Sequence, residues 1–344
     1  MTNAPASALA KLTGFKVPNW GKIPALMKRE FLDSKTSFFH LPLVAVGLTL
    51  LVLLMLMISF EVRYSDSVAL DLRNMTITVE GEVIAHNGDF TDLLDAEDRG
   101  KFAQVFSRVV SGSNSAGLIM ILPFVVFFGL LGALYDDRKD RSYLFWKSMP
   151  VSDTREVLAK LGFYTFAGPA LLFVFMMVSG IAAMSLVTPF IWLHDGSAME
   201  LLWGPAPFIS MWFAAAANYF VYALWVLPIL AWLLLASAYA PKAPMIFAVV
   251  PIIAIVGAEA IFNGGKTWLG EALLDRIAID YGTIMGEILD RPGHFGPHFE
   301  INELTLGDAG RALMMSVANA KFWAGHLFTA AFVAGAIYLR RYRV

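Results

Sequence analysis

The sequence predicts an all-α polytopic membrane protein with six transmembrane helices. Of its 344 residues, 58% are hydrophobic and only 16% are charged, and the mean hydropathy is +0.63, which is too apolar for a soluble domain of this length. A helix needs about 20 apolar residues to cross the hydrocarbon of a bilayer. Six stretches meet or approach that length, near residues 40–60, 114–135, 159–185, 208–236, 244–263 and 320–339.

Residues 1–38 are expected to form a leader that ends in an interfacial helix, ahead of a six-helix domain at 39–344. Residues 1–21 contain no apolar stretch of signal-peptide length, so we expect the first span to be retained. Further on, apolar residues fall on one helical face and basic residues on the others, which is typical of a helix lying on a membrane surface. These residues are Ile23, Leu26, Met27, Phe31 and Phe38, with Lys28, Arg29 and Lys35. A flexible basic leader attracted to anionic lipid is the alternative.

An even number of spans places both termini on one side of the membrane, and the basic residues indicate which side. Most of the 26 Lys and Arg residues fall near the termini and in the 136–158 segment, and the positive-inside rule holds such residues in the cytoplasm. Most of the 28 acidic residues fall in the opposite loops. We therefore expect both termini and the 136–158 segment to be cytoplasmic. The formal net charge of −2 argues against a nucleic-acid partner, and the absence of Cys excludes disulfides and thiolate metal sites.

Two outer loops, 61–113 and 264–319, are longer than simple connections, so we expect both to be structured. In the first loop, apolar residues alternate over 77–85, a pattern that predicts a small β-hairpin. Apolar residues at helical spacing occur in both loops, at 102–109 and at 268–273. These patterns predict short helices outside the membrane.

The inner segment 136–158 combines charges of both signs with aromatic residues and a proline. Pro150 cannot continue a helix and disfavours helical geometry in the residue before it, so we predict a short helix over about 138–147. Asp153 with Glu156 has the spacing of a capping box at the start of the third span. Aromatic and Arg side chains are frequent anchors of protein interfaces, so this segment suits the docking of a soluble protein. An ordinary loop whose aromatics lie at the lipid headgroups is the alternative.

At these residues the sequence resembles the permease subunits of ABC-2 type ABC transporters. In that family an interfacial helix with a basic-acidic-aromatic stretch precedes the first span, and a coupling helix with an acidic start and a Ser-x-Pro turn joins the second and third spans. The similar residues here are Lys28-Arg29-Glu30-Phe31, Asp136-Asp137-Arg138, Ser148-Met149-Pro150-Val151-Ser152 and Lys160. Six spans, a long outer region after the fifth span and the basic tail over 339–343 also fit the family.

The resemblance implies an exporter subunit of the bacterial inner membrane that binds no cofactor and hydrolyses no ATP itself. ATP and Mg²⁺ would bind a separate cytoplasmic ABC ATPase, and a second permease copy, identical or related, would complete the transporter among the membrane lipids. A lipid, peptide or amphipathic molecule would move outward. The residues expected to couple to the ATPase are Glu30, Asp137, Arg138, Asp140, Arg141, Tyr143, Phe145, Trp146, Lys147 and Pro150. The P-loop-like Gly264-Gly265-Lys266-Thr267 has Ala260 where the motif requires Gly, so we expect an ordinary loop there.

Three polar residues inside the predicted spans form a candidate substrate path. Glu259 is the only acidic residue within a predicted span, and intramembrane carboxylates are costly enough to suggest a function. Asn218 and Tyr222 belong to a polar-aromatic stripe at helical spacing on the fourth span. Snorkelling of Glu259 toward water and ordinary packing of the stripe are the alternatives.

A second function class is an ATP-driven mechanical transmitter, in which the outer loops act on a periplasmic partner and nothing is transported. A membrane-embedded enzyme is disfavoured because the sequence has no HExxH motif, no inward-facing Asp pair and no Ser-His arrangement at usable spacing. A secondary transporter is disfavoured because the sequence shows no inverted repeat. No catalytic or metal-binding residue is therefore predicted.

Overall fold

In the part of the chain that the computed structural model describes, six helices are long and apolar enough to cross a membrane, which confirms the predicted six-helix architecture. They are Thr36–Ser59, Val109–Lys139, Asp153–Leu193, Ile209–Tyr239, Pro244–Phe262 and Ala320–Tyr342. The third, with 41 residues, extends beyond the predicted span at both ends. The structure describes residues 23–73, 76–79, 82–85, 103, 106–107, 109–112, 115–141, 152–193, 197–204, 208–279, 281–284 and 305–342.

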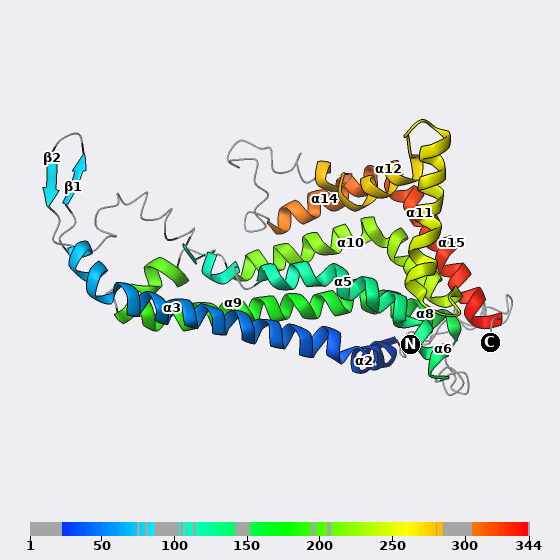
Figure 1. Ribbon diagram of the computed structural model, residues 1–344. Helices are drawn as coiled ribbons and strands as arrows, with labels where there is room; N and C mark the ends of the chain where they lie inside the picture. The colour runs from blue at the N-terminus through cyan, green and yellow to red at the C-terminus, as the bar shows by residue number, and fades with distance from the viewer. Residues whose placement is uncertain are drawn as a thin grey trace, which may run out of the picture.

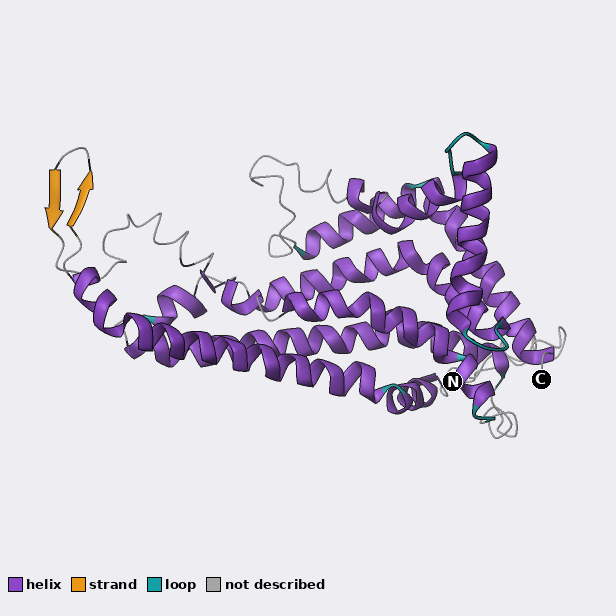
Figure 2. Ribbon diagram, viewed as in Figure 1, coloured by secondary structure: helices purple, strands orange, loops and turns teal. Residues whose placement is uncertain are grey.

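Helices and π-helical segments (η) make up almost all of the described chain (Figures 1 and 2). In chain order the helices and strands are α2 (Ile23–Asp33), η2 (Thr36–His40), α3 (Leu41–Arg73), β1 (Thr76–Val79), β2 (Glu82–Ala85), α5 (Ser115–Ala133), α6 (Tyr135–Lys139), α8 (Asp153–Gly162), η4 (Phe163–Ala167), α9 (Gly168–Leu193), η5 (Met199–Trp203), α10 (Phe208–Tyr239), α11 (Pro244–Phe262), α12 (Trp268–Leu274), η6 (Asp275–Ile279), α14 (Leu306–Ala318) and α15 (Ala320–Tyr342).

Helix α10 is the centre of the bundle (Figure 1). It packs against α5, α11, α14 and α15, while α9 contacts both α5 and α3. The largest apolar cluster surrounds Leu234 of α10 and includes Leu130, Val157 and Leu172, so α5, α8 and α9 share one core with α10. This packing fixes the end of α5 and the start of α8 beside the end of α10.

Two glycines allow the first helices to approach the third span closely. A Cβ on Gly129 of α5 would overlap the ring of Tyr164, and a Cβ on Gly168 would lie 2.5 Å from a ring carbon of Phe38. Phe38 is fully buried, although it lies in the short segment η2 that leads into α3. Close contact with η4 and α9 therefore holds the start of the first span against the third.

The apolar part of α3, up to Ser59, and helix α11 bury little surface within the chain. Only 11% of the most apolar stretch of the first span and 6% of that of α11 are buried. Residues such as Leu48 and Leu56 on α3, and Ile253 on α11, are more than half exposed. Exposed apolar surface all around a long helix is typical of a lipid-facing span. In Figure 1, α11 crosses α10 steeply instead of running along it.

Helix α3 continues past the apolar span as far as Arg73 and leads to a β-hairpin (Figure 1). Strands β1 and β2 are antiparallel, with Thr76 opposite Ala85 and Val79 opposite Glu82. The hairpin expected from the alternation over 77–85 is therefore present. It lies at the end of α3 farthest from α2.

The second long loop also contains helices. α12 occupies the position predicted at 268–273, and α14 packs along α10 with Ala312 and Ser316 fully buried. Thr305 and Asp308 form a capping box at the start of α14, where the Thr305 amide donates to Asp308 Oδ2 at 2.9 Å. The helical pattern at 102–109 falls only partly within the described residues. The region after α11 is thus partly wrapped against the bundle.

Candidate functional site

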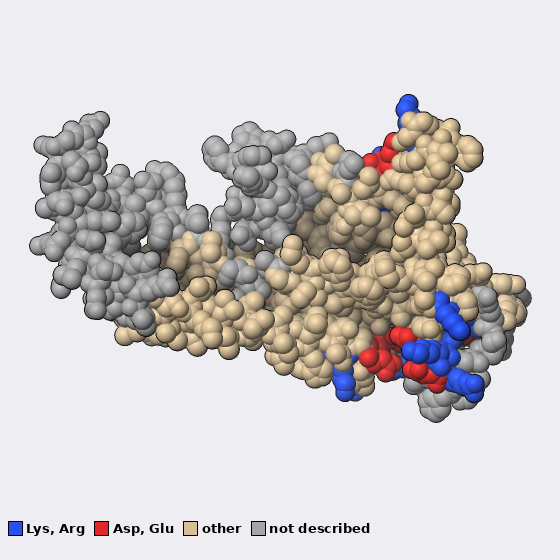
Figure 3. Space-filling view, in the orientation of Figure 1, with Lys and Arg blue, Asp and Glu red and all other residues tan. Residues whose placement is uncertain are grey.

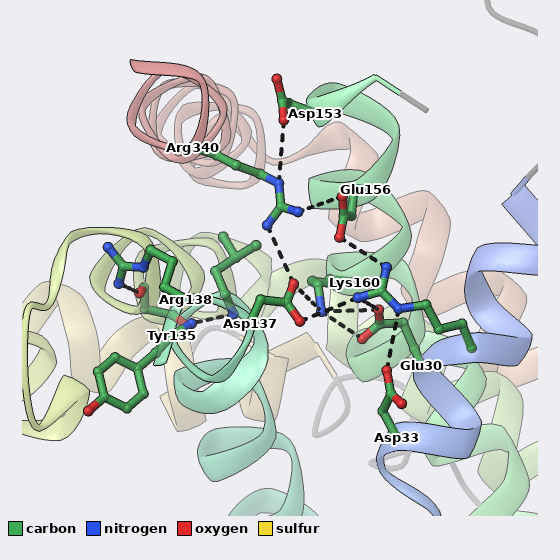
Figure 4. Close-up of polar contacts among 12 residues, drawn as sticks. Glu30, Asp33, Tyr135, Asp137, Arg138, Asp153, Glu156, Lys160 and Arg340 are labelled. Carbon is green, nitrogen blue, oxygen red and sulfur yellow. Dashed lines mark hydrogen bonds and ion pairs between the residues drawn. The ribbon is translucent and has the colours of Figure 1, made fainter. Parts of the chain in front are cut away.

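Charged side chains gather at one end of the bundle, where α2, α6, the start of α8 and the last turns of α15 meet (Figures 1 and 3). We call this the charged end. Six buried side chains there form a charge network, shown in Figure 4. The network consists of Arg29, Glu30, Asp137, Glu156, Lys160 and Arg340.

Local sequence explains how α2 and α8 present these charges inward. On α2, Leu26 and Glu30 are four residues apart and both are buried, because positions four apart share a helix face. On α8, Glu156 and Lys160 have the same spacing and flank the fully buried Val157. Helix α2 packs on α8 and η4, so the predicted interfacial helix uses its inner face to contact protein. Two amphipathic faces therefore meet across their charges as well as their apolar residues.

Lys160 joins α8 to both α2 and α6. Its Nζ lies 3.0 Å from the Glu30 carboxylate and 3.3 Å from Asp137 Oδ2. The side chains of Lys160 and Glu30 are each only 3% exposed. An ammonium this deeply buried requires such partners, because a lone buried charge costs several kcal/mol or more.

Arg29 of α2 reaches the same two neighbouring helices. Its Nη1 donates to Glu156 Oε1 at 3.1 Å, and its Nη2 donates to Asp137 Oδ1 at 3.3 Å. Its Nε also lies 3.4 Å from the exposed Asp33 one turn away. The planar guanidinium can bond several carboxylates at once, which an ammonium does with less defined geometry.

Arg340 brings the end of α15 into the network. Its Nη2 pairs with Glu156 Oε2 at 2.5 Å, its Nη1 lies 3.5 Å from Asp137 Oδ2, and its Nε lies 3.6 Å from Asp153 Oδ1. Asp137 consequently faces all three cations, one from each of α2, α8 and α15. It is the centre of the network.

The six charges balance, three positive against three negative, and none of the side chains is more than 12% exposed. Burial raises the pKa of Glu30, and the attraction of Lys160 and Arg29 offsets this only in part. For Arg29, burial lowers the pKa, but the nearby carboxylates outweigh it and raise the pKa above its usual value. Removal of one charge would leave the others unbalanced in a region with little water.

Arg138 lies beside the network but has different partners. Its guanidinium donates to the carbonyls of Ser237, Ala238 and Ala240 at the end of α10, at 2.6, 2.5 and 2.9 Å. A cation is favoured there, since the last carbonyls of a helix lack amide partners and carry partial negative charge. The backbone amides of Leu134 and Tyr135 also donate to Ser237 Oγ, each at 3.0 Å. Helix α6 is thereby fastened to the end of α10.

The residues expected to contact an ATPase divide into three groups. Glu30 and Asp137 are buried in the network, so they do not form an exposed docking surface as expected, and Arg138 is engaged with α10. Asp140 and Arg141 are exposed. The others lie outside the described residues: Tyr143, Phe145, Trp146, Lys147 and Pro150.

The helix predicted over about 138–147 is described only over its first residues, where Arg138 belongs to the last turn of α6 and Arg141 adopts a left-handed conformation with φ of 55°. The capping box predicted at Asp153 and Glu156 is wrong, because the N-cap of α8 is Ser152, without a side-chain cap. Asp153 and Glu156 face Arg340 instead, and charge-assisted bonds to a guanidinium are stronger than a bond to a backbone amide.

The candidate substrate path is brought together only in part. Asn218 and Tyr222 of α10 both contact the segment after α12: Tyr281 donates its hydroxyl to the Asn218 carbonyl at 3.1 Å, and Tyr222 donates to the Ile277 carbonyl at 2.9 Å. Glu259 has a separate role at the end of α11. It accepts the Leu269 amide at 2.9 Å and so caps the start of α12.

Sequence reasoning missed four members of the network: Arg29, Glu156, Lys160 and Arg340. One signal was present, because Lys160 lies inside the predicted third span and therefore needed a buried partner. Its partner Glu30 is 130 positions away along the chain, a separation that no local pattern reveals. Among the described residues, no group of three or more His, Asp or Glu side chains is placed to hold a metal ion.

Comparison with known proteins leaves the family open. No protein-family model matches the sequence, no curated protein matches it, and no solved structure matches the fold. Functional argument therefore depends on the charge network and on the sequence resemblance described above.

Proposed function

We propose that this chain is the permease subunit of an ATP-driven ABC-2 type exporter of the bacterial inner membrane, with both termini in the cytoplasm. A separate cytoplasmic ATPase would bind ATP and Mg²⁺, and a second permease copy would complete the transporter. The charge network is the observation that supports this most strongly. It connects both flanks of the 142–151 segment to two further helices, so a force on that segment would reach the whole bundle.

The network suits the transmission of movement because its cost of separation is high. Each cation bonds carboxylates on at least two helices, and a buried charge that loses its partner costs several kcal/mol. Helices α2, α6, α8 and α15 would therefore move together. Helix α15 packs extensively on α10, which also contacts α14, so movement at the charged end would be passed to the helices after α11.

Outward movement of a lipid, peptide or amphipathic substrate follows from the resemblance to the family. The polar contacts between α10 and the segment after α12 lie far from the charge network along α10, and they are the place where we expect a substrate to pass. Asn218 and Tyr222 are the residues of α10 proposed to meet it.

The mechanical transmitter remains a second proposal because of one observation. Helix α3 extends past its apolar span and carries a β-hairpin away from the bundle, where it could contact a periplasmic partner (Figure 1). Deletion of residues 75–110 distinguishes the two. Continued substrate efflux by the deletion variant would count against the transmitter.

Co-purification with the products of neighbouring genes tests the proposed partnership. We expect an ATPase to co-elute with the tagged chain in detergent, and to be lost when Phe145 and Trp146 are both replaced by Ala. The matched control replaces Phe262 and Trp268, exposed aromatics at the ends of α11 and α12, and should retain the ATPase. If no ATPase co-elutes with the wild-type chain under any condition, the exporter proposal fails.

A further inference from the structure

A second arrangement of polar and aromatic groups lies on the other half of α10, around the partly exposed guanidinium of Arg276. The guanidinium carbon lies 5.0 Å from the centre of the Trp225 ring, and Nη2 donates to the Lys321 carbonyl at 2.6 Å. A cation over an indole face is attracted by the negative charge of the π-system. Arg276 thus lies against an aromatic face and donates to a carbonyl oxygen.

The walls of this position are buried and belong to three different helices. Trp225 of α10 is fully buried, and its Nε1 donates to Ser316 Oγ of α14 at 2.6 Å. Phe322 of α15 packs edge-on against the same ring at 5.5 Å. Gly325 of α15 forms the floor, because a Cβ there would overlap the guanidinium. We call this position the Trp225 slot.

The walls of the slot are buried, whereas the segment that fills it is held mainly by polar contacts. Arg276 belongs to η6, which follows α12, a helix without a buried residue. Hydroxyl bonds from Tyr222 to Ile277 and from Tyr281 to Asn218 hold this segment on α10, and Ile284 adds an apolar contact. An ion pair between Asp275 and Lys321 at 3.3 Å is largely exposed. Exchange of such bonds for water costs little, so η6 can leave the slot more easily than the walls can deform.

We propose that the Trp225 slot is a binding site for an organic cation, and that Arg276 occupies it from within the same chain in this state. The ligand class is the ammonium or guanidinium head of an amphiphile. The ring face and the Lys321 carbonyl accept a cation without adding a charge of their own, and exposed apolar side chains nearby, Ile277 and Trp323, suit a hydrocarbon tail. This assigns a substrate class to the proposed export path, and its role in export rests on the proposed function, whereas the binding itself does not.

Removal of the Arg276 side chain, which would compete with a ligand for the slot, provides the test. In the purified full chain without any ATPase, we expect Arg276→Ala to bind octylguanidinium, below its micelle concentration, about tenfold tighter than the wild type, since the ligand no longer displaces a tethered cation. The gain should disappear when Trp225→Leu is added. The matched control is Arg311→Ala, which removes an exposed Arg of α14 and should leave binding unchanged.

Two results would overturn the proposal. One is equal octylguanidinium binding by Arg276→Ala and the wild type; the other is a gain that persists after Trp225→Leu. If Arg276→Ala fails to fold, Arg276→Gln keeps the side-chain length without the charge and is measured in its place. Because no ATPase is present, a negative result here leaves the exporter proposal intact, and loss of the exporter proposal leaves this binding measurement valid.

Discussion

Replacement of Lys160 by Met tests the physical basis of the charge network. Met preserves the length of the side chain and removes the charge, so Glu30 and Asp137 are left buried with one cation fewer. At 3.0 Å and an effective dielectric constant of about 20, the attraction between Lys160 and Glu30 is roughly 5 kcal/mol before the cost of burying both charges. Removal of one member of such a pair typically destabilises a protein by about 3–5 kcal/mol.

The double variant makes the prediction specific. Lys160→Met with Glu30→Gln removes both charges and leaves two cations facing two carboxylates, so we expect it to recover at least half of the lost stability. Glu30→Gln alone should cost less than Lys160→Met, because it also removes a carboxylate that burial disfavours. Lys139→Met is the matched control, since Lys139 is exposed on α6 and should change stability by less than about 0.5 kcal/mol.

Reversible unfolding in mixed micelles of dodecyl maltoside and SDS, followed by circular dichroism, gives the free energy of unfolding of the wild type, the two single variants, the double variant and the control. Energetic coupling appears as a double variant that is more stable than the sum of the two single changes predicts. The reasoning is refuted if Lys160→Met stays within about 1 kcal/mol of the wild type, or if the two changes are additive.

Three further predictions concern packing, the end of α10 and pH. Gly129→Ala should destabilise by about 1–3 kcal/mol because its Cβ would overlap a buried ring, whereas Gly117→Ala on the same helix has open space and should be tolerated, as the same unfolding assay would report. Arg138→Ala should cost about 2 kcal/mol through its lost bonds to helix carbonyls, and Arg141→Ala should cost less than 0.5 kcal/mol; similar losses for both would contradict this role. Burial raises the pKa of Glu30 above its usual 4.5, so protonation of Glu30 stabilises the folded state, fully below pH 4.5 and progressively less as the pH rises through the raised pKa. The free energy of unfolding, measured from about pH 4 to 8, should therefore fall in the wild type by an amount that Glu30→Gln does not show.

Hydrophobic periodicity was sufficient to predict the spans and the hairpin, because lipid imposes apolar stretches of fixed length and strand alternation has a period of two. The apolar face of α2 was also readable, and Leu26 and Phe38 are buried as the pattern implies. Glu30 was expected to couple to an ATPase and therefore to be exposed, since a lone carboxylate in the interior is costly. The structure buries it because Lys160, far along the chain, approaches it.

Competition between partners explains why the predicted capping box at the start of α8 does not form. Asp153 and Glu156 have the sequence spacing of a capping box, but two guanidinium groups from other helices take their oxygens. Arg138 continues α6 because carbonyls at the end of α10 hold its side chain. Each of these partners comes from tertiary packing, so the charges could be read from the sequence while their pairing could not.

Transmission of movement through the charge network is the central claim, and an ATP-dependent distance measurement tests it most directly. The chain has no Cys, so spin labels attached to Asp140→Cys and Met314→Cys would be the only ones on the protein. Both positions are exposed, the first on the turn after α6 and the second on α14. With the co-purified ATPase present, we predict that ATP shifts the distance distribution between the labels. Arg340→Lys should abolish the shift while the exposed Arg341→Lys preserves it. An equal ATP-driven shift in Arg340→Lys, or no shift in the wild-type complex, would contradict the account.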